Sequence, residues 1–469
     1  MRDRPAGLTA SAVGPSARGA PVALLCLSAT ALGCALQVNF GQYHPLALPW
    51  LAAALAGVAL CAAKPRRRPI DSFDRWVLAT CVAVQFVLLL SGSPGATGAL
   101  ATGGDLLPFR AGIVAAAAVC GVSWWAMGRW RGALVIALVG VHAIMGLWTL
   151  RAAPHPGVDV CVFQRESAEA LVHGSNPYSI TFPDPYADSS RFYGPGVSQD
   201  GRLQFGYPYP PLSLLLIVPA HLLGDFRYAQ LAAMALAGLL VALARPGRLA
   251  LAAAALLLFT PRGFFVLEAG WTEPFAVLFL AATVFALCRC PRWVALPLGL
   301  LLASKQYLVL ALLATPLLPT VPRFRTVAGA LVTAAALTLP MALWDLPSFL
   351  RTVVALQWHQ PFRDDALSFL VPRAQGAGMN SPAWIAFVLA GAAALVGVRK
   401  LPRTPATFAL TVAFTFLVFF AFNKQAFCNY YHFVIGALCC AIGAASEDSR
   451  SEFSDLGFGS PGHRSRKIM

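Results

Sequence analysis

Long apolar runs separated by short polar turns fill most of the chain between residues 21 and 445. A helix needs about 20 apolar residues to cross the roughly 30 Å hydrocarbon core of a bilayer, and shorter runs count where other helices cover them. The pattern predicts about fourteen spans, and so an all-α, polytopic transmembrane helical bundle. The predicted spans are 21–38, 45–63, 75–91, 110–127, 132–150, 227–244, 249–262, 272–288, 293–304, 306–319, 325–344, 382–398, 404–422 and 428–445.

Two polar stretches, residues 151–226 and 345–381, are too long to be turns between spans. With the N-terminus placed in the cytoplasm, the basic short loops all fall on the cytoplasmic side, and both long loops are predicted to face outside. The basic loops lie near residues 64–68, 129–131, 245–248, 289–292, 323–325 and 399–403. The tails, 1–20 and 447–469, lack an apolar pattern and are predicted to be disordered in the cytoplasm, with a cleaved signal peptide as the alternative for the first.

Composition agrees with a membrane protein: 58% of residues are hydrophobic, 12% are charged, and the mean hydropathy of +0.66 excludes an ordinary soluble domain. The net charge of +15 is explained by the basic cytoplasmic loops, so nucleic acid is not expected as a partner. The 11 cysteines show no metal-ligand spacing and are interpreted as small apolar fillers. His359, Asp364 and Asp365 are interpreted as hydrated loop residues, so neither a metal nor a cofactor is predicted.

The first long loop begins with a helical pattern, in which Val160, Phe163 and Leu171 recur on one face. This pattern predicts an amphipathic helix along the membrane surface, ended by Gly174, which supports a left-handed cap. Asp159 precedes the helix directly after a span. Two interpretations stay open for it, an N-cap and a catalytic carboxylate. Further along, 212–223 follows too many prolines for a regular span and is predicted to be re-entrant or interfacial.

Several motifs then follow one another in order: an outside acid after a span (Asp159), FQRESAEALVHGSNPY, YPYPPLSLLLIVP, and Ser304-Lys305-Gln306-Tyr307 at an outer span end. Over residues 132–446 this order resembles the C-type (GT-C) integral membrane glycosyltransferases, and within them family 87, the polyprenyl-phosphate-mannose-dependent mannosyltransferases. The resemblance implies a catalytic region over 132–446 with surface helices in both outside loops. It also implies that Asp159 is the catalytic base. Residues 21–131 form a further set of N-terminal helices.

The chemistry of such a transfer needs only one carboxylate, because a polyprenyl phosphate leaves without a proton, whereas glycosidases use two. Asp159 would take the proton of an acceptor hydroxyl that attacks opposite the phosphate, with inversion. Cations are needed for the phosphate. Lys305-Gln306 and Lys424-Gln425 each stand at the outer end of a span, where snorkelling toward the interface is the alternative role. Arg262 is a third candidate cation.

Five further residues are candidates for substrate contact. Glu268 and Glu273 flank the outer start of a span, where a structural ion pair with the nearby arginine is the alternative. His359 and Asp364 belong to the second long loop and would otherwise be solvated. Tyr431 lies near the outer end of the last span, where aromatic residues also form an interfacial belt.

The sequence therefore predicts a multi-pass cell-membrane enzyme with an extracytoplasmic active site. It would move a sugar, mannose by the resemblance, from a polyprenyl-phosphate carrier to a glycan or glycolipid acceptor. The first alternative is a transporter or flippase for a lipid-linked saccharide. Transporters place ionisable groups near the midplane and often show repeats, whereas here the polar groups gather at one face. The second alternative is a structural membrane protein without catalysis.

Overall fold

The computed structural model of the chain describes residues 21–64, 70–101, 105–186, 192–319, 321–377 and 382–445. The two predicted tails, 1–20 and 447–469, lie outside the described residues. The described part is all-α, as predicted, apart from one small sheet in the first long loop. That sheet joins β1 (Phe182–Pro183), β3 (Arg202–Leu203) and β2 (Ser198–Gln199) in the order β1-β3-β2.

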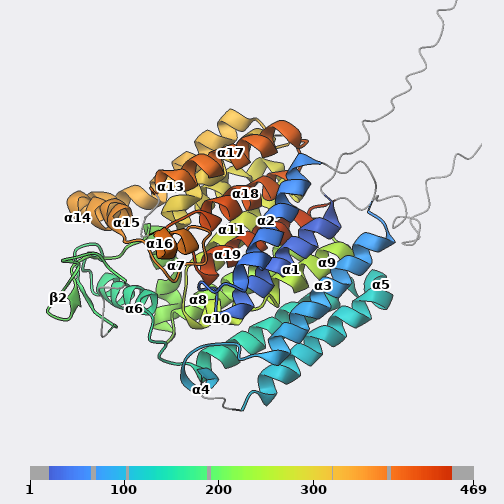
Figure 1. Cartoon of the computed structure of the whole chain (residues 1–469), viewed down its shortest axis with the longest axis horizontal. Helices are drawn as coiled ribbons and strands as arrows, with labels where there is room; N and C mark the ends of the chain where they lie inside the picture. The colour runs from blue at the N-terminus through green and yellow to red at the C-terminus, as the bar shows by residue number, and fades with distance from the viewer. Residues whose placement is uncertain are drawn as a thin grey trace, which may run out of the picture.

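Most predicted apolar runs form helices within a few residues of their expected bounds (Figure 1). These are α1 (Val22–Val38), α2 (Ala47–Ala63), α3 (Ser72–Ser91), α8 (Arg227–Ala244), α9 (Arg248–Leu258), α11 (Glu273–Arg289), α12 (Ala295–Ser304), the 3₁₀ helix η3 (Gln306–Leu317), α13 (Arg323–Trp344), α17 (Trp384–Lys400), α18 (Pro405–Ala421) and α19 (Cys428–Gly443). By length and composition, α3, α8, α13 and the helix α5 (Leu107–Ala152) could cross a membrane, and several of the other apolar helices are shorter.

Helix α5 replaces two predicted spans, 110–127 and 132–150. It is not one straight rod, because Ala126 leaves the helical region with φ −113° and ψ 18°. The rings of Phe109 and Trp148, from opposite ends, lie 5.7 Å apart. The two halves therefore turn back on each other as an antiparallel hairpin, which agrees with two separate predicted runs.

Helices α18 and α19 form the centre of the bundle. Every residue of α18 is buried, and nearly all of α19 is buried too. Their residues are mostly apolar and buried around the whole helix, which is the pattern of a helix surrounded by others. Helices α2, α17 and η3 pack on α18, and α1, α9 and α11 pack on α19. The short connection between α18 and α19, residues 422–427, therefore emerges in the middle of one end of the bundle.

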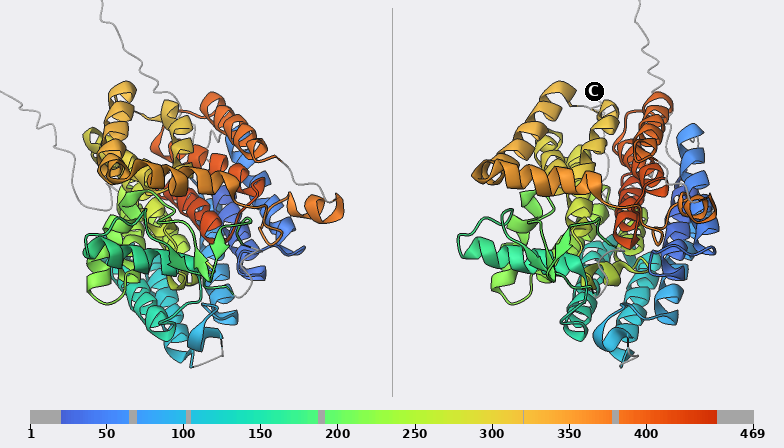
Figure 2. Two further views of the ribbon diagram at one scale, coloured as in Figure 1. Left: turned by 90° about the vertical axis from the view of Figure 1, so that its left-hand side faces the viewer. Right: turned by 60° about the vertical axis from the view of Figure 1, so that its left-hand side comes forward.

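The two long loops meet at this same end (Figures 1 and 2). The Ser179 hydroxyl donates to Asp345 at 2.8 Å, and the rings of Tyr178 and Phe349 lie 4.9 Å apart. The turn between α1 and α2 joins them through a β-bridge between Gln42 and Ala366. Three segments far apart in sequence thus form one face, which is where the polar candidates gather.

Helix α6 (Asp159–Val172) forms where the amphipathic pattern predicted it, and Gly174 beyond its end takes φ +74°. Its apolar face packs on protein, because the Phe163 ring lies 4.9 Å from Phe182 and the helix also contacts α7 (Pro211–Leu222). Its outer face carries the exposed, charged Arg165 and Glu166. Protein therefore covers the face that carries Phe163, and the predicted position of this helix along the membrane surface stays a prediction.

The second long loop instead contains a helical segment with an exposed apolar face. It comprises α14 (Leu346–Leu350), the π-helical turn η4 (Arg351–Ala355) and α15 (Leu356–His359), and is followed by α16 (Val371–Ala377). Leu346, Leu350, Val354 and Trp358 are 45%, 47%, 55% and 73% exposed and are spaced four residues apart. Residues at this spacing share one helix face. Phe349 and Val353 of the same segment are buried.

Candidate functional site

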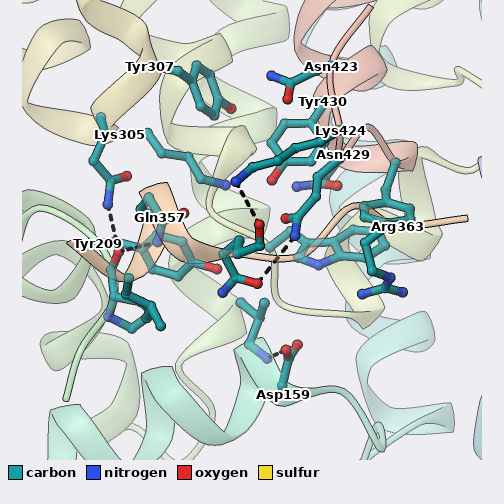
Figure 3. A pocket seen from close by; sticks show the side chains of 18 of the residues that line it. Asp159, Tyr209, Lys305, Tyr307, Gln357, Arg363, Asn423, Lys424, Asn429 and Tyr430 are labelled. Carbon is teal, nitrogen blue, oxygen red and sulfur yellow. Dashed lines mark hydrogen bonds between the residues drawn. The ribbon is translucent and has the colours of Figure 1, made fainter. Parts of the chain in front are cut away.

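A cavity of about 650 Å³ lies where the long loops meet the helix ends. It is lined by side chains from α6, η3, the 422–427 connection, the second long loop and the turn before α2. Figure 3 shows Asp159 on one side of this cavity, and Lys305, Lys424 and Tyr430 on the other. The volume lies within the roughly 300–1,000 Å³ range of small-molecule sites.

Asp159 is the first residue of α6, and Val158 occupies the N-cap position. Its Oδ1 accepts the Val160 backbone N–H at 2.7 Å, and its Oδ2 accepts the Tyr193 hydroxyl at 2.6 Å. The start of α6 is fixed by the Cys161 thiol, which donates to the Ala269 carbonyl at 3.1 Å. A carboxylate has about four lone-pair sites, so two hydrogen bonds leave room for a substrate hydroxyl. Asp159 is the one acidic residue of the described chain that lines the cavity.

Burial raises the pKa of the Asp159 carboxyl above its usual value. Hydrogen bonds from Tyr193 and Val160 and the positive charge of Arg363 act in the opposite direction, but burial is the largest effect. Removing a carboxylate from water disfavours its charged form. A carboxylate with a raised pKa accepts a proton more readily, which suits a general base.

Lys305 lines the cavity and is held in place by one carboxylate and three aromatic rings. Its Nζ lies 2.5 Å from Glu273 Oε1, and both side chains are buried. The same Nζ lies 4.9, 5.5 and 5.2 Å from the rings of Tyr209, Tyr307 and Tyr430. Tyr307 also donates its hydroxyl to Glu273 at 3.0 Å. Glu273, a predicted substrate contact, therefore stands behind Lys305 and is not among the residues that line the cavity.

Lys424 also lines the cavity, but carbonyl groups hold it in place of a carboxylate. Its Nζ donates to the carbonyls of Trp358 and Gln360, at 3.0 and 2.7 Å. No ion pair among the described residues includes it. Partial burial lowers the pKa of its ammonium group. Lys424 therefore brings a positive charge with no acidic partner into the cavity.

The two predicted glutamines line the cavity and join its walls. Gln306 donates from Nε2 to the carbonyls of Pro208 and Val353, at 2.6 and 3.1 Å. Gln425 donates to Oε1 of Gln360 at 3.2 Å. Both amides thus connect the ends of spans to the long loops.

Arg262 and Glu268 bind the N-terminal loops and do not line the cavity. The guanidinium of Arg262 donates to the carbonyls of Ser93 and Gln37, at 2.9 and 3.3 Å. The Glu268 carboxylate accepts the backbone N–H groups of Ala96 and Thr97, at 2.9 and 2.7 Å. The two side chains form no direct ion pair with each other, and the predicted substrate contact of Glu268 stays a prediction.

Three other predicted residues also lie outside the lining. Tyr431 is fully buried and donates its hydroxyl to the Leu367 carbonyl at 2.5 Å, so it joins α19 to the second loop. His359 and Asp364 are exposed. His359 uses Nδ1 to contact its own helix at the Ala355 carbonyl, 2.8 Å away. These positions agree with structural and solvated roles.

Arg363 and Tyr193 are two of the cavity residues that were not among the predicted site residues. Arg363 forms an ion pair with Asp365 at 2.6 Å, and its Cζ lies 4.5 Å from the ring centroid of Phe192. Tyr193 is the hydrogen-bond donor to Asp159. The Arg363-Asp364-Asp365 run was a visible signal for Arg363, but no pattern in the irregular loop singles out Tyr193, or Phe192, which stacks on Tyr186.

One part of the cavity wall is apolar. It is formed by Val309, Val354, Phe387 and Phe419, from η3, the second loop, α17 and α18. Val309, Val354 and Phe387 are 52%, 55% and 45% exposed. The cavity therefore combines a charged part with an accessible apolar part.

No family model matches the chain, and neither a curated protein nor a solved structure matches it. Among the described residues, no group of three or more His, Cys, Asp and Glu side chains could hold a metal ion.

Proposed function

We propose that this protein is a membrane glycosyltransferase of the GT-C type. It moves a sugar, mannose by the sequence resemblance, from a polyprenyl-phosphate carrier to an extracytoplasmic glycan or glycolipid. This proposal is supported by the residues that line one cavity in the described part of the chain. They are the single carboxylate of Asp159, the cations Lys305, Lys424 and Arg363, and an apolar wall. A lipid-linked sugar phosphate has the complementary parts, namely an anion, a hydroxylated ring and an apolar chain.

The reaction uses Asp159 as general base. An acceptor hydroxyl hydrogen-bonded to the carboxylate attacks the anomeric carbon, and Asp159 takes its proton as the new C–O bond forms. The bond from the anomeric carbon to the phosphate oxygen breaks, and its electron pair leaves with the polyprenyl phosphate. Attack from the side opposite the leaving group inverts the anomeric configuration.

The cations stabilise the phosphate, which gains negative charge as it leaves. Lys424 is the strongest candidate, because no acid neutralises it among the described residues. Lys305 is paired with Glu273, so it supplies a fixed donor with little net charge. Preorganised donors directed at developing charge are a large contribution to catalysis in a site shielded from water.

The test is a transfer assay with purified protein in lipid nanodiscs, radiolabelled polyprenyl-phosphate mannose and a panel of glycan acceptors. The parent should yield labelled, inverted product. In Asp159→Asn the amide has no basic oxygen, so we expect transfer to fall by roughly 10²- to 10⁴-fold. Folding should be preserved, because Asn can still accept the Val160 N–H.

Two outcomes would contradict the proposal. Transfer by well-folded Asp159→Asn within about threefold of the parent would remove the base from the mechanism, since a general base contributes at least about 10²-fold. Movement of the intact labelled lipid across the bilayer of proteoliposomes, without sugar transfer to any acceptor, would favour the transporter alternative.

A further inference from the structure

The turn between α1 and α2, residues 39–43, forms part of the cavity wall. Phe40 and Gln42 both line the cavity. Gln42 is exposed, and its side-chain amide makes no hydrogen bond to any described residue. A carboxamide offers both donors and an acceptor. The N-terminal helices thus present an unused hydrogen-bonding group to the cavity.

The backbone of this turn is held in a conformation that most residues avoid. Phe40 and Gly41 have φ values of 51° and 73°, in the left-handed region. A Cβ atom on Gly41 would lie 2.6 Å from the Cα of Cys428, so only glycine allows this close approach. The Tyr43 N–H donates to the Asp365 carbonyl at 2.8 Å. Contacts with both α19 and the second loop therefore fix the turn.

Arg262 holds the Phe40 ring from behind. Its Cζ lies 3.5 Å from the ring centroid, and Arg262 itself has φ +66°. The guanidinium is fixed in turn by the Ser93 and Gln37 carbonyls. Two non-glycine residues in the left-handed region thus contact each other beside the cavity. Such strain persists where the surroundings over-determine it, and it clusters at functional sites.

Phe40 begins a row of aromatic side chains on this wall. Its ring lies 5.2 Å from Phe265, which lies 5.1 Å from Trp271, and all three residues line the cavity. A sugar ring has an apolar C–H face and hydroxyl groups around its edge. An aromatic row beside a free carboxamide is complementary to both features, whereas a lipid chain would leave the amide unused and a bare phosphate would leave the aromatic row unused.

We propose that the 39–43 turn is a specificity-determining wall for a sugar unit of the ligand. Gln42 hydrogen-bonds the sugar hydroxyls, Phe40 packs against its C–H face, and Arg262 is the positioning residue for that ring. This inference rests on the proposed function for the class of ligand. The sugar unit belongs to the donor or to the acceptor, and the experiment distinguishes the two.

The experiment compares dissociation constants of two lipids, polyprenyl-phosphate mannose and polyprenyl phosphate, for the full chain in nanodiscs. The variants are Gln42→Ala and Arg262→Gly, and His44→Ala is the control, because His44 is close in sequence but does not line the cavity. For a donor sugar, Gln42→Ala should weaken binding of the mannosyl lipid by about two- to tenfold and leave polyprenyl phosphate unchanged. Arg262→Gly keeps its backbone conformation, since glycine tolerates positive φ, and should give the same selective loss. Arg262→Lys should retain part of the affinity for the mannosyl lipid.

For an acceptor sugar, both lipid affinities stay unchanged in Gln42→Ala while the acceptor KM rises at constant kcat. The inference is overturned if the Gln42 and Arg262 variants change neither lipid affinity nor acceptor KM by more than twofold. The inference is also overturned if the variants weaken binding of both lipids equally, which would indicate a structural role. Normal transfer by the parent in those cases leaves the proposed function standing. A parent that binds neither lipid and transfers no sugar contradicts the proposed function, and this inference with it.

Discussion

At the scale of single residues, the Asp159 carboxyl is surrounded by groups with opposite effects on its pKa. Burial raises the pKa, and the Tyr193 hydrogen bond lowers it. Tyr193→Phe removes a bond that favours the carboxylate, so the pKa should rise further. A general base acts when deprotonated. We therefore expect the acid limb of the kcat/KM profile to move to higher pH in Tyr193→Phe, with little change on its alkaline side.

The sign of the stability effect provides a control for this prediction. A carboxyl whose pKa is higher in the folded than in the unfolded state stabilises the fold most below its unfolded value, near 3.8. That contribution is lost as pH rises through the folded pKa. Protonation of Asp159 at low pH should therefore not unfold the protein, but it should abolish transfer, because the base is then protonated. Thermal unfolding measured over the same pH range would separate loss of activity from loss of folding. An acid limb of the kcat/KM profile that does not move in Tyr193→Phe would contradict the role assigned to Asp159.

Lys424 is the cation whose role is simplest to test. Because no acid neutralises it among the described residues, Lys424→Met should weaken binding of polyprenyl phosphate by about tenfold or more, and Lys424→Arg should retain most of it. Lys400→Met, at an exposed lysine of α17 outside the cavity, is the matched control. Binding measured by scintillation proximity gives the comparison. Equal affinity of Lys424→Met and the parent would remove the phosphate role.

The same substitution at Lys305 would not be informative by itself. Removing one partner of a buried ion pair costs about 3–5 kcal/mol, because the other charge is left unpaired. Lys305→Met would leave the fully buried Glu273 carboxylate without its partner, so loss of binding and loss of folding would coincide.

Sequence reasoning found those site residues that stand directly at the end of an apolar run. Asp159, Lys305 and Lys424 were predicted because each follows a hydrophobic segment, where a charge needs an explanation. Tyr193 lies in an irregular loop, where no periodicity distinguishes a cavity residue from a solvated one. Arg262 and Glu268 do not line the cavity, because they bind backbone groups of loops more than 160 positions away, which sequence spacing does not reveal.

At the scale of elements, apolar runs predicted the helices well and their surroundings less well. The mostly apolar run 404–422 formed α18, in which every residue is buried. Helix α6 ends just before Gly174, as predicted. An amphipathic pattern, however, predicts only that the apolar face of the helix is shielded from water. Whether protein or lipid covers it depends on tertiary contacts, and for α6 the cover is Phe182, Phe205 and α7.

The exposed apolar face of the α14–α15 segment carries a separate prediction. Leu350 is 47% exposed and does not line the cavity, so we expect it to lie in the outer part of the bilayer. A fluorophore on Leu350→Cys should be quenched by brominated lipids. The same fluorophore on Glu166→Cys, at the polar face of α6, should not be. Equal quenching at both positions would contradict the assignment, as would quenching at Glu166 alone.

At the scale of the whole molecule, one end of the bundle combines both long loops, the 39–43 turn and the cavity. Charge asymmetry predicts that the cavity end is extracytoplasmic. The convergence of the loops could not be read from the sequence, because contacts such as Ser179–Asp345 join positions 166 residues apart. Positive charge along the chain does, however, predict which loops share a side.

This topology can be measured by cysteine labelling in intact cells. Gln199→Cys in the first long loop and His359→Cys in the second, both exposed, should react with a membrane-impermeant maleimide without permeabilisation. The native Cys290, exposed between α11 and α12, should react only after permeabilisation, because it lies between Arg289 and Arg292 in a basic loop. The remaining cysteines would be replaced, since their apolar surroundings give them no topological information. The opposite labelling pattern would place Asp159 in the cytoplasm, and an extracytoplasmic acceptor could then not reach the base.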